Sequence, residues 1–322
     1  MRLLVIKPTA LGDVAHALQV VPYLKAIGWC DHLAWVVDED YAPLVESCPL
    51  VDQVIGFPRK RWRRKRPLSE IIGWAGKLRQ QSFDLVLDLQ GLARSALMTL
   101  ASGCPKRIGL ESSREGSRFV YTKRVNDTAS HAIDRYAAAC GNLVGACPLP
   151  QVYLETKPDR GLIKRFEGQP YTVIHAYSQR DEKLWPWRYV QELVERLPDE
   201  RFVLVGQGSR FPCSGHHIYD LRNRTSLKEL IPVIGGAQAL ISTDSGPLHI
   251  AAALGIPVLG IYGASLPERT RPRGKRAFYL WNPEFSHNLK RSILPAHVSA
   301  EAMESITPDF VVNRWRDLIK SS

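Results

Sequence analysis

The segment from Ser242 to Val258 holds the densest set of groups suited to binding an anion. A strand is expected to end at its start, and Asp244, Ser245 and Gly246 follow before an apolar helix begins. Hydroxyls and backbone N–H groups at a helix N-terminus suit a diphosphate, although the segment is neither GxGxxG nor a Walker motif. His249 falls in the first turn of that helix. A buried core histidine would also explain it, and we favour contact with a ligand.

A lysine occupies the loop Ser178 to Pro186, which follows an expected strand ending at His175. If Pro186 is the first helical residue, Lys183 projects near a helix N-terminus. A cation there opposes the helix macrodipole, and a bound anion would remove the conflict. A solvated surface lysine is the alternative, and we favour the anion site.

The segment Lys7 to Asp13 lies where the first expected strand meets the first helix. In open α/β sheets this carboxyl edge is where ligands bind. Asp13 is either a carboxylate that caps the helix or a general base beside a binding cleft, and spacing alone leaves both open.

Seven of the nine residues from Pro58 to Arg66 are basic. So dense a run is not buried unpaired, and a solvated face is its ordinary explanation. Mutual repulsion nevertheless favours a bound anion, and arginine suits phosphate or carboxylate. A nucleic-acid partner stays open on charge alone, although no recognised nucleic-acid-binding motif surrounds the run.

The bulk composition indicates a globular protein whose positive net charge favours anionic partners. The chain has 322 residues, a formal net charge of +11 and 45% hydrophobic residues, which fits two domains of ordinary size. Six cysteines without a CxxC pair or zinc spacing predict free thiols in a reducing compartment. The first apolar run is too short for a signal peptide, and no apolar stretch reaches membrane-spanning length. We expect a cytoplasmic protein that can touch the cytoplasmic face of the inner membrane through its basic face.

Strand and helix patterns alternate and then restart, which predicts an α/β fold with mainly parallel sheets. The expected strands are 3–6, 33–37, 52–57, 83–88, 171–175, 201–206, 239–242 and 256–262. The expected helices are 14–26, 68–81, 187–197, 226–235, 249–254 and 308–320. A proline-containing stretch from Cys147 to Pro158 separates domains 1–155 and 156–322. We expect the last helix to pack back onto the first domain.

Four segments together resemble glycosyltransferase family 9, the ADP-heptose:lipopolysaccharide heptosyltransferases. They are the LGD segment ending at Asp13, DLVLDLQGLARSALM from Asp84 to Met98, EKLWP, and STDSGPLHIAAALG from Ser242 to Gly255. The stretch Trp35 to Glu39 and the basic run resemble heptosyltransferase I more than heptosyltransferase II. The resemblance implies a GT-B fold, in which two facing Rossmann-like domains hold the acceptor and the nucleotide sugar. It also implies inverting transfer of heptose from ADP-heptose to Kdo on lipid A, with no metal required for chemistry.

The resemblance assigns roles to single residues. Asp13 would be the catalytic base, and Lys183 would lie near the donor phosphate and sugar. The donor-side positions are Ser178, Gln179, Lys183, Thr225, Asp244, Ser245, Gly246 and His249. The acceptor-side positions are Lys7, Thr9, Lys60, Arg61, Arg63, Arg64, Gln90 and Arg114. The expected partners are an ADP-sugar and an anionic glycolipid of the Kdo-lipid A type, with no nucleic acid, and a use of Mg²⁺ stays open.

Two segments depart from the family's pattern. Gly206 to Arg210 lacks the acidic residue that many relatives carry, so the nucleotide base is open. Tyr262 to Ser265 stands where Gly-Pro-Thr is common. One alternative is a member with another acceptor, such as heptosyltransferase II or a protein heptosyltransferase. Another is a non-catalytic nucleic-acid-binding protein. Thermal stabilisation by ADP rather than by an oligonucleotide would favour the enzyme.

Overall fold

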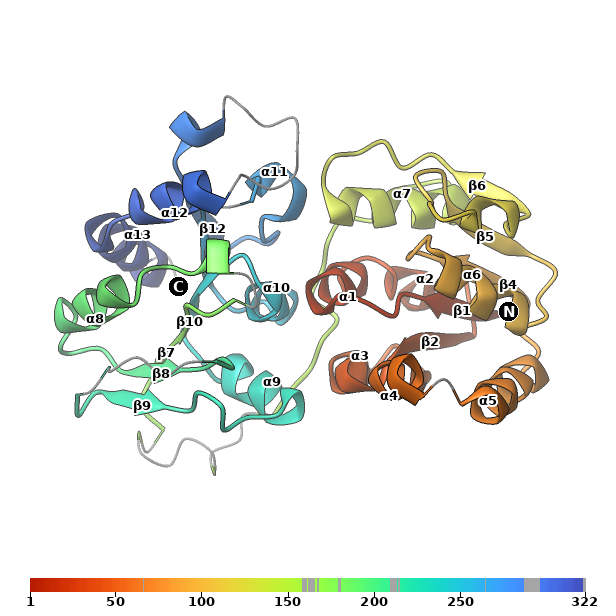
Figure 1. Ribbon diagram of the computed structural model, residues 1–322, viewed down its shortest axis with the longest axis horizontal. Coiled ribbons are helices and arrows are strands. Elements are labelled where there is room, and N and C mark those ends of the chain that lie inside the picture. Colours follow the sequence, from red (N-terminus) through yellow and green to blue (C-terminus); the bar gives the residue numbers. More distant parts are fainter. Residues whose placement is uncertain are drawn as a thin grey trace. The chain divides into compact units, whose positions relative to one another are not determined.

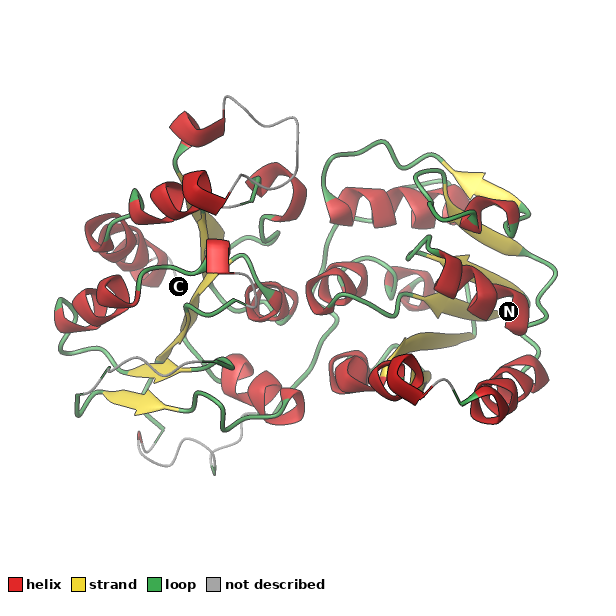
Figure 2. Cartoon of the chain, viewed as in Figure 1, coloured by secondary structure: helices red, strands yellow, loops and turns green. Residues whose placement is uncertain are grey.

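The computed structural model describes residues 1–65, 67–157, 161, 166, 168–178, 181–208, 213, 215–263, 265–286 and 296–320 (Figures 1 and 2). The chain divides into two compact units, Met1–Glu155 and Thr156–Ser322. Each unit has its own six-stranded sheet with helices on it. All paired strands run parallel, which confirms the predicted α/β class.

The sheet of the first unit has the strand order β3-β2-β1-β4-β5-β6. Its strands are β1 (Arg2–Ile6), β2 (His32–Asp38), β3 (Gln53–Phe57), β4 (Leu85–Asp88), β5 (Arg107–Leu110) and β6 (Lys123–Val125). The central strands are apolar because helices cover both faces of a parallel sheet. Ile6 at the end of β1 lies opposite Val36 and Asp88. The loops that follow these strands therefore open at one carboxyl edge.

The helices of the first unit follow the strand order. They are α1 (Leu11–Leu18), α2 (Tyr23–Ala26), η1 (Glu39–Tyr41), α3 (Ala42–Glu46), α4 (Arg59–Lys65), α5 (Leu68–Gln80), α6 (Ala93–Ala101), η2 (Ser117–Phe119) and α7 (Ala132–Val144). Right-handed crossovers place α5 and α6 on the face opposite α1 and α3, because the chain reverses its direction across the sheet after β3. Leu78 of α5 and Met98 of α6 accordingly pack with Leu4 and Val36.

The prediction of one helix over 14–26 was wrong, because the chain forms two short helices there. α1 ends at Leu18, and α2 begins after Pro22, which is its N-cap residue. Proline has no N–H group to donate to a preceding turn, so the first helix cannot continue through it.

The sheet of the second unit has the strand order β12-β11-β10-β7-β8-β9. Its strands are β7 (Thr172–His175), β8 (Phe202–Leu204), β9 (Ile218–Asp220), β10 (Ala239–Thr243), β11 (Val258–Tyr262) and β12 (Ala277–Trp281). Ser242 of β10 lies opposite His175 of β7. The loops after these two central strands therefore meet at one carboxyl edge of this sheet.

The helices of the second unit include the one at the C-terminal end of the chain. They are η4 (Asp181–Lys183), α8 (Trp187–Glu195), α9 (Leu227–Gly235), α10 (Gly246–Ala253), α11 (Pro267–Thr270), η5 (Pro283–Ser286), α12 (Ala296–Glu304) and α13 (Pro308–Lys320). The apolar face of α13 lies in the core of the second unit, where Val311, Trp315 and Leu318 are buried with Leu193 of α8. The expected packing of this helix on the first domain stays a prediction.

Two further predictions concern cysteines and membrane spans. The six cysteines are free thiols in the structure, and four of them are buried. Among the helices that the structure describes, none has the length and apolar character needed to cross a bilayer.

Candidate active site

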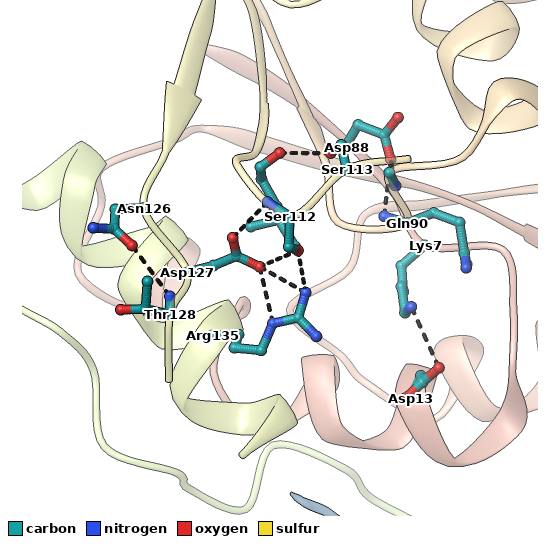
Figure 3. A network of polar contacts seen from close by, with 12 residues as sticks. Lys7, Asp13, Asp88, Gln90, Ser112, Ser113, Asn126, Asp127, Thr128 and Arg135 are labelled. Atoms are coloured by element: carbon teal, nitrogen blue, oxygen red, sulfur yellow. Dashed lines mark hydrogen bonds and ion pairs between the residues drawn. The ribbon is translucent and has the colours of Figure 1, made fainter. Parts of the chain in front are cut away.

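Lys7 and Asp13 lie at the carboxyl end of β1, on either side of the turn into α1 (Figure 3). Nζ of the buried Lys7 is 3.5 Å from Oδ2 of Asp13 and 5.4 Å from the centre of the Tyr136 ring. Burial would lower the pKa of Lys7, but Tyr136 and Asp13 outweigh it and raise that pKa above its ordinary value. Lys7 is therefore an ammonium at neutral pH. We expected it to contact an acceptor, whereas its burial makes it the anchor of the Asp13 carboxylate.

Asp13 caps the start of α1, which is one of the two roles that the sequence left open. It is the third residue of α1, and the Ala10 N–H donates to its Oδ2 at 3.4 Å. The contact with Lys7 falls on the same oxygen. The side chain is nevertheless 39% exposed. A carboxylate that caps the helix and is held by a buried cation thus still reaches solvent.

Gln90 joins the loop after β1 to the loop after β4. Its Oε1 accepts hydrogen bonds from the Thr9 N–H at 3.1 Å and the Thr9 hydroxyl at 3.4 Å. Its own N–H donates to the buried Asp88 at 2.8 Å, and burial raises the pKa of Asp88. The Arg114 N–H donates to the carbonyl of Gly91 at 2.8 Å. Three predicted acceptor-side residues are therefore brought together at this edge.

A second polar network at this edge was not predicted from the sequence (Figure 3). Oδ2 of the buried Asp127 accepts from the Ser112 hydroxyl at 2.5 Å and from two nitrogens of Arg135 at 2.9 Å and 2.6 Å. Arg135 also donates to the Ser112 hydroxyl. These contacts tie the loops after β5 and β6 to α7, the helix that carries Tyr136.

The basic helix α4 is attached to the first unit through an aromatic residue. Trp62 packs on Phe57 and Trp74, with ring centres 5.8 Å and 5.7 Å away. Its Nε1 donates to Glu70 at 3.0 Å, and Arg61 forms an ion pair with the same carboxylate. The single tryptophan in the basic run therefore fixes the direction of the surrounding cations.

The four predicted cations of α4 have different surroundings. Nζ of Lys60 is 2.8 Å from Oδ2 of Asp40, and Arg61 is paired as described above. Among the described side chains, no acidic group lies within ion-pair distance of the exposed Arg63 and Arg64. Of the four predicted cations, these two arginines are thus best able to meet an external anion.

The second unit holds a compact polar cluster around Asp244, at the end of β10. Its Oδ2 accepts from Nζ of Lys183 and from the Ser265 hydroxyl, both at 2.6 Å. Its Oδ1 is 3.2 Å from Nε2 of His249. Burial would raise the pKa of Asp244, but the hydrogen bond from His249 and the charge of Lys183 hold it well below its usual range. Asp244 is therefore an anion at neutral pH.

These contacts correct the reasoning that led to Lys183. We expected a cation whose conflict with a helix dipole a bound anion would remove. Pro186 is the N-cap of α8 rather than its first residue, and the anion beside Lys183 is the chain's own Asp244. The buried His249 likewise holds Asp244 through Nε2, which makes it a positioning residue for that carboxylate.

A histidine and two serines lie beside this cluster. Nδ1 of His175 is 3.0 Å from the Ser245 hydroxyl and 3.3 Å from the Ser242 hydroxyl. Burial lowers the pKa of His175 to about 4, so its ring is neutral at pH 7. Ser245 is the N-cap of α10, and Gly246 and Pro247 begin the helix. The N-terminus of α10 thus lies beside the hydroxyls of Ser242 and Ser245, the combination from which the sequence analysis predicted an anion site.

The loop after β8 approaches this edge closely because it contains glycine. A Cβ on Gly208 would overlap the ring of Tyr177, and the φ of Gly208 is +145°. Asn223 pairs with the backbone N–H and carbonyl of Gly208 at 2.8 Å each. Thr225 follows two residues later and is half-buried beside the start of α9. Its predicted place near an adenine edge stays a prediction.

Two more predicted donor-side residues belong to the loop after β7. Ser178 is half-buried there, whereas Gln179 lies outside the described residues. Trp185 anchors the far end of the loop, because it is buried in the core and its Nε1 donates to the carbonyl of Ile306 at 2.8 Å. Among the described residues, no group of three or more His, Cys, Asp or Glu side chains is placed to hold a metal ion.

Comparison with known protein families identifies the family of this chain. The model described as glycosyltransferase family 9 (heptosyltransferase) matches residues 74–295, which is more than half of the chain. The chain belongs to glycosyltransferase family 9. Lipopolysaccharide heptosyltransferase 1 of Pseudomonas aeruginosa is 29% identical over 297 residues, covering 87% of this chain and 83% of the relative. The family 9 chain is accordingly a heptosyltransferase of lipopolysaccharide core biosynthesis.

Solved structures show the same fold. The ADP-heptose lipopolysaccharide heptosyltransferase II of E. coli superposes with a TM-score of 0.79 at 22% identity, covering 100% of this chain and 99% of that one. E. coli heptosyltransferase WaaC with ADP-2-deoxy-2-fluoro heptose gives 0.75 at 23% identity, with coverages of 98% and 99%. The family 9 chain thus has the GT-B fold.

Sequence reasoning missed several residues of the site. Tyr136 lies on α7, a helix for which no prediction was made. His175 ends a predicted strand, and its meeting with Ser242 depends on strand order. Ser265 was noted only as a departure from the family 9 pattern, yet it supplies a hydroxyl to Asp244. Because Gly-Pro-Thr also ends in a hydroxyl residue, its chemistry could have been anticipated.

Proposed function

We propose that this heptosyltransferase moves heptose from ADP-heptose to Kdo on a lipid A-type acceptor, with inversion at the anomeric carbon. The similarity to lipopolysaccharide heptosyltransferase 1 supports this acceptor. The solved heptosyltransferase with an ADP-2-deoxy-2-fluoro heptose supports this class of donor. The observation that carries the chemistry is the anchored but part-exposed carboxylate of Asp13.

In the proposed reaction Asp13 is the general base. Lys7 and the Ala10 N–H both engage Oδ2, which leaves Oδ1 to receive a proton. The acceptor hydroxyl gives up that proton as its oxygen attacks the anomeric carbon. The bond between the anomeric carbon and the diphosphate then breaks, and ADP departs with the electron pair. Thr9, Gln90 and Arg114 lie at the same carboxyl edge of the sheet and would orient the acceptor.

The second unit would hold the donor. An ammonium has three N–H groups, and Lys183 commits one to Oδ2 of Asp244 at 2.6 Å and a second to the Asp244 carbonyl at 3.5 Å. The third remains for the diphosphate, together with Ser245 and the N-terminus of α10. Asp244 already accepts from three side chains. We therefore assign it to the orientation of Lys183 and of one sugar hydroxyl, not to the phosphates, which it would repel.

The basic helix would bind the anionic acceptor. Arg63 and Arg64 lack acidic partners among the described side chains, and the guanidinium fork suits carboxylates and phosphates. Kdo carries a carboxylate and lipid A carries phosphates. Because Lys60 and Arg61 are already paired with carboxylates of the chain, we assign the larger share of acceptor binding to Arg63 and Arg64.

A second candidate acceptor is favoured by the strong superposition on heptosyltransferase II. That enzyme shares the fold, so an acceptor beyond the first Kdo is compatible with these residues. Offering the product of the first transfer as an acceptor in its own right separates the two. Only an enzyme of the second type would extend that product and leave Kdo-lipid A untouched.

The base assignment is tested by Asp13→Asn. Loss of a general base costs about 10²–10⁴-fold in rate, so kcat should fall by that factor while the Kd for ADP stays unchanged. Asp134→Asn is the matched control, because Asp134 is an exposed aspartate in the first turn of α7 in the same unit. A variant with weakened ADP binding and normal turnover of bound donor would refute the assignment.

A further inference from the structure

Large exposed apolar side chains gather on one face of the first unit. We call this the α5–α6 surface, and its apolar members are Leu68, Ile72, Leu97, Leu100 and Phe119. Leu68 and Ile72 are 72% and 69% exposed and lie one turn apart on α5, so they point to the same side of that helix. α5 packs beside α6, and α6 packs against η2. Such a gathering of apolar groups typically marks an interaction surface.

The same surface is bordered by cations. Exposed arginines and lysines on these elements, and on the helix α4 that adjoins α5 through Trp62, are Arg63, Arg64, Lys65, Lys77, Arg79, Arg94 and Arg118. The acidic groups on these elements are engaged within the chain. Glu70 pairs with Arg61, and Glu115 accepts from the Ala93 N–H at 3.1 Å. A partner would therefore meet apolar side chains surrounded by net positive charge.

The position of the α5–α6 surface relative to the carboxyl edge of the sheet suits an enzyme whose acceptor is anchored in lipid. α5 and α6 connect the end of one parallel strand to the start of the next, so each begins near the carboxyl edge. Leu68 and Ile72 occupy the first two turns of α5. They therefore lie toward the edge that carries Asp13, Gln90 and Arg114.

We propose that the α5–α6 surface docks on an anionic lipid bilayer. Leu68 and Ile72 enter the boundary between headgroups and acyl chains, and Arg63 and Arg64 meet the phosphates of the headgroups. Charge complementarity selects this occupant, because a second copy of the chain would bring the same cations against themselves. Docking on the bilayer is independent of the proposed function. Its consequence, that docking presents a bilayer-embedded acceptor to the carboxyl edge, rests on the proposed function.

Vesicle co-sedimentation of the full chain tests the docking directly. The probes are phosphatidylcholine vesicles and vesicles in which about a third of the lipid is phosphatidylglycerol. The wild type should bind the anionic vesicles and not the neutral ones. Leu68→Ser/Ile72→Ser should lower the partition coefficient roughly tenfold or more, since burial of each side chain contributes appreciably. The matched control is Leu149→Ser/Phe310→Ser, which removes two exposed apolar groups elsewhere and should bind like the wild type.

Three outcomes would overturn the proposal. The first is equal binding of anionic vesicles by wild type and Leu68→Ser/Ile72→Ser. The second is equal loss in the control variant. The third is sedimentation of the wild type as a dimer that Leu68→Ser/Ile72→Ser dissociates, which would assign the surface to a second copy. None of these readouts depends on catalysis, so they stand even if the proposed acceptor is wrong.

A kinetic arm links the surface to the reaction. Leu68→Ser/Ile72→Ser should lower kcat/KM for an acceptor embedded in anionic vesicles about tenfold, in line with its weaker partition. The same variant should transfer at wild-type rate to a delipidated acceptor in solution. Equal losses on both acceptors would contradict docking as the cause. Absence of transfer by the wild type to either acceptor would instead contradict the proposed function.

Discussion

Removal of the Lys183 ammonium should destabilise the second unit, because it leaves a buried carboxylate without its cation. Nζ of Lys183 lies 2.6 Å from Oδ2 of Asp244, and the two side chains are 17% and 8% exposed. In Lys183→Met the stem of the side chain is retained and only the charge is lost. His249 and Ser265 would remain as partners of the carboxylate.

The expected cost follows from the burial of the pair. Breaking a buried ion pair from one side typically costs about 3–5 kcal/mol. Two remaining hydrogen bonds and the partial exposure of Lys183 place Lys183→Met at the low end, about 3 kcal/mol. For a unit of this size that lowers Tm by about 6–12 °C. Lys183→Met/Asp244→Asn leaves no stranded charge, so it should recover about half of the loss.

Urea unfolding followed by circular dichroism measures these changes. The control is Arg188→Met, because Arg188 and Glu304 form an ion pair of similar length that is more than half exposed. Exposed pairs contribute about 0–1 kcal/mol, so the control should barely change the midpoint. The reasoning is refuted if Lys183→Met costs no more than Arg188→Met. It is also refuted if the double variant is less stable than Lys183→Met.

Three further predictions concern the acceptor, pH and metals. Arg63→Glu/Arg64→Glu should raise the KM for Kdo-lipid A at least tenfold and leave the Kd for ADP unchanged, whereas Arg316→Glu/Lys320→Glu, an equal charge change on α13, should alter neither. Equal effects of both variants in steady-state kinetics would contradict this. His175 has a folded-state pKa of about 4 against about 6.5 when unfolded, so the unfolded chain takes up a proton between these values. The stability should therefore fall by about 1.4 kcal/mol per pH unit as pH drops from about 6.5 to 4. His175→Gln should flatten that slope in urea titrations, and an unchanged slope would exclude this histidine. Transfer should keep its rate after treatment with EDTA, and a loss restored by Mg²⁺ would show that the diphosphate needs a cation.

The architecture was predictable because local sequence patterns decide it. Buried parallel strands appear as apolar runs such as 3–6 and 239–242, and their alternation with helices leaves few other folds. Three edge strands, β6, β9 and β12, escaped prediction together with β5, whereas the edge strand β3 was predicted. β9 and β12 are short or only half-buried, so their sequences lack the continuous apolar run of a central strand. The split of helix 14–26 depended on Pro22, a signal that was present and was not used.

Residues of the site were predictable where a loop follows a strand, and not where their partners come from elsewhere in the chain. Asp13, Asp244 and His249 stand beside recognisable turns, so their positions at a carboxyl edge could be anticipated. The ion pair between Lys183 and Asp244 joins residues 61 positions apart. It depends on β7 and β10 being neighbours, which periodicity does not reveal. Only the structure shows that Arg61 is paired with Glu70 whereas Arg63 has no acidic partner among the described side chains.

Transfer from ADP-heptose to purified Kdo-lipid A, followed by mass spectrometry, tests the central claim most directly. The wild type should add one heptose to each acceptor, and Asp13→Asn should give product only at a rate lower by about 10²–10⁴-fold. A wild-type enzyme that leaves Kdo-lipid A unmodified would contradict the proposed acceptor. An Asp13→Asn variant that transfers at the wild-type rate would contradict the proposed base.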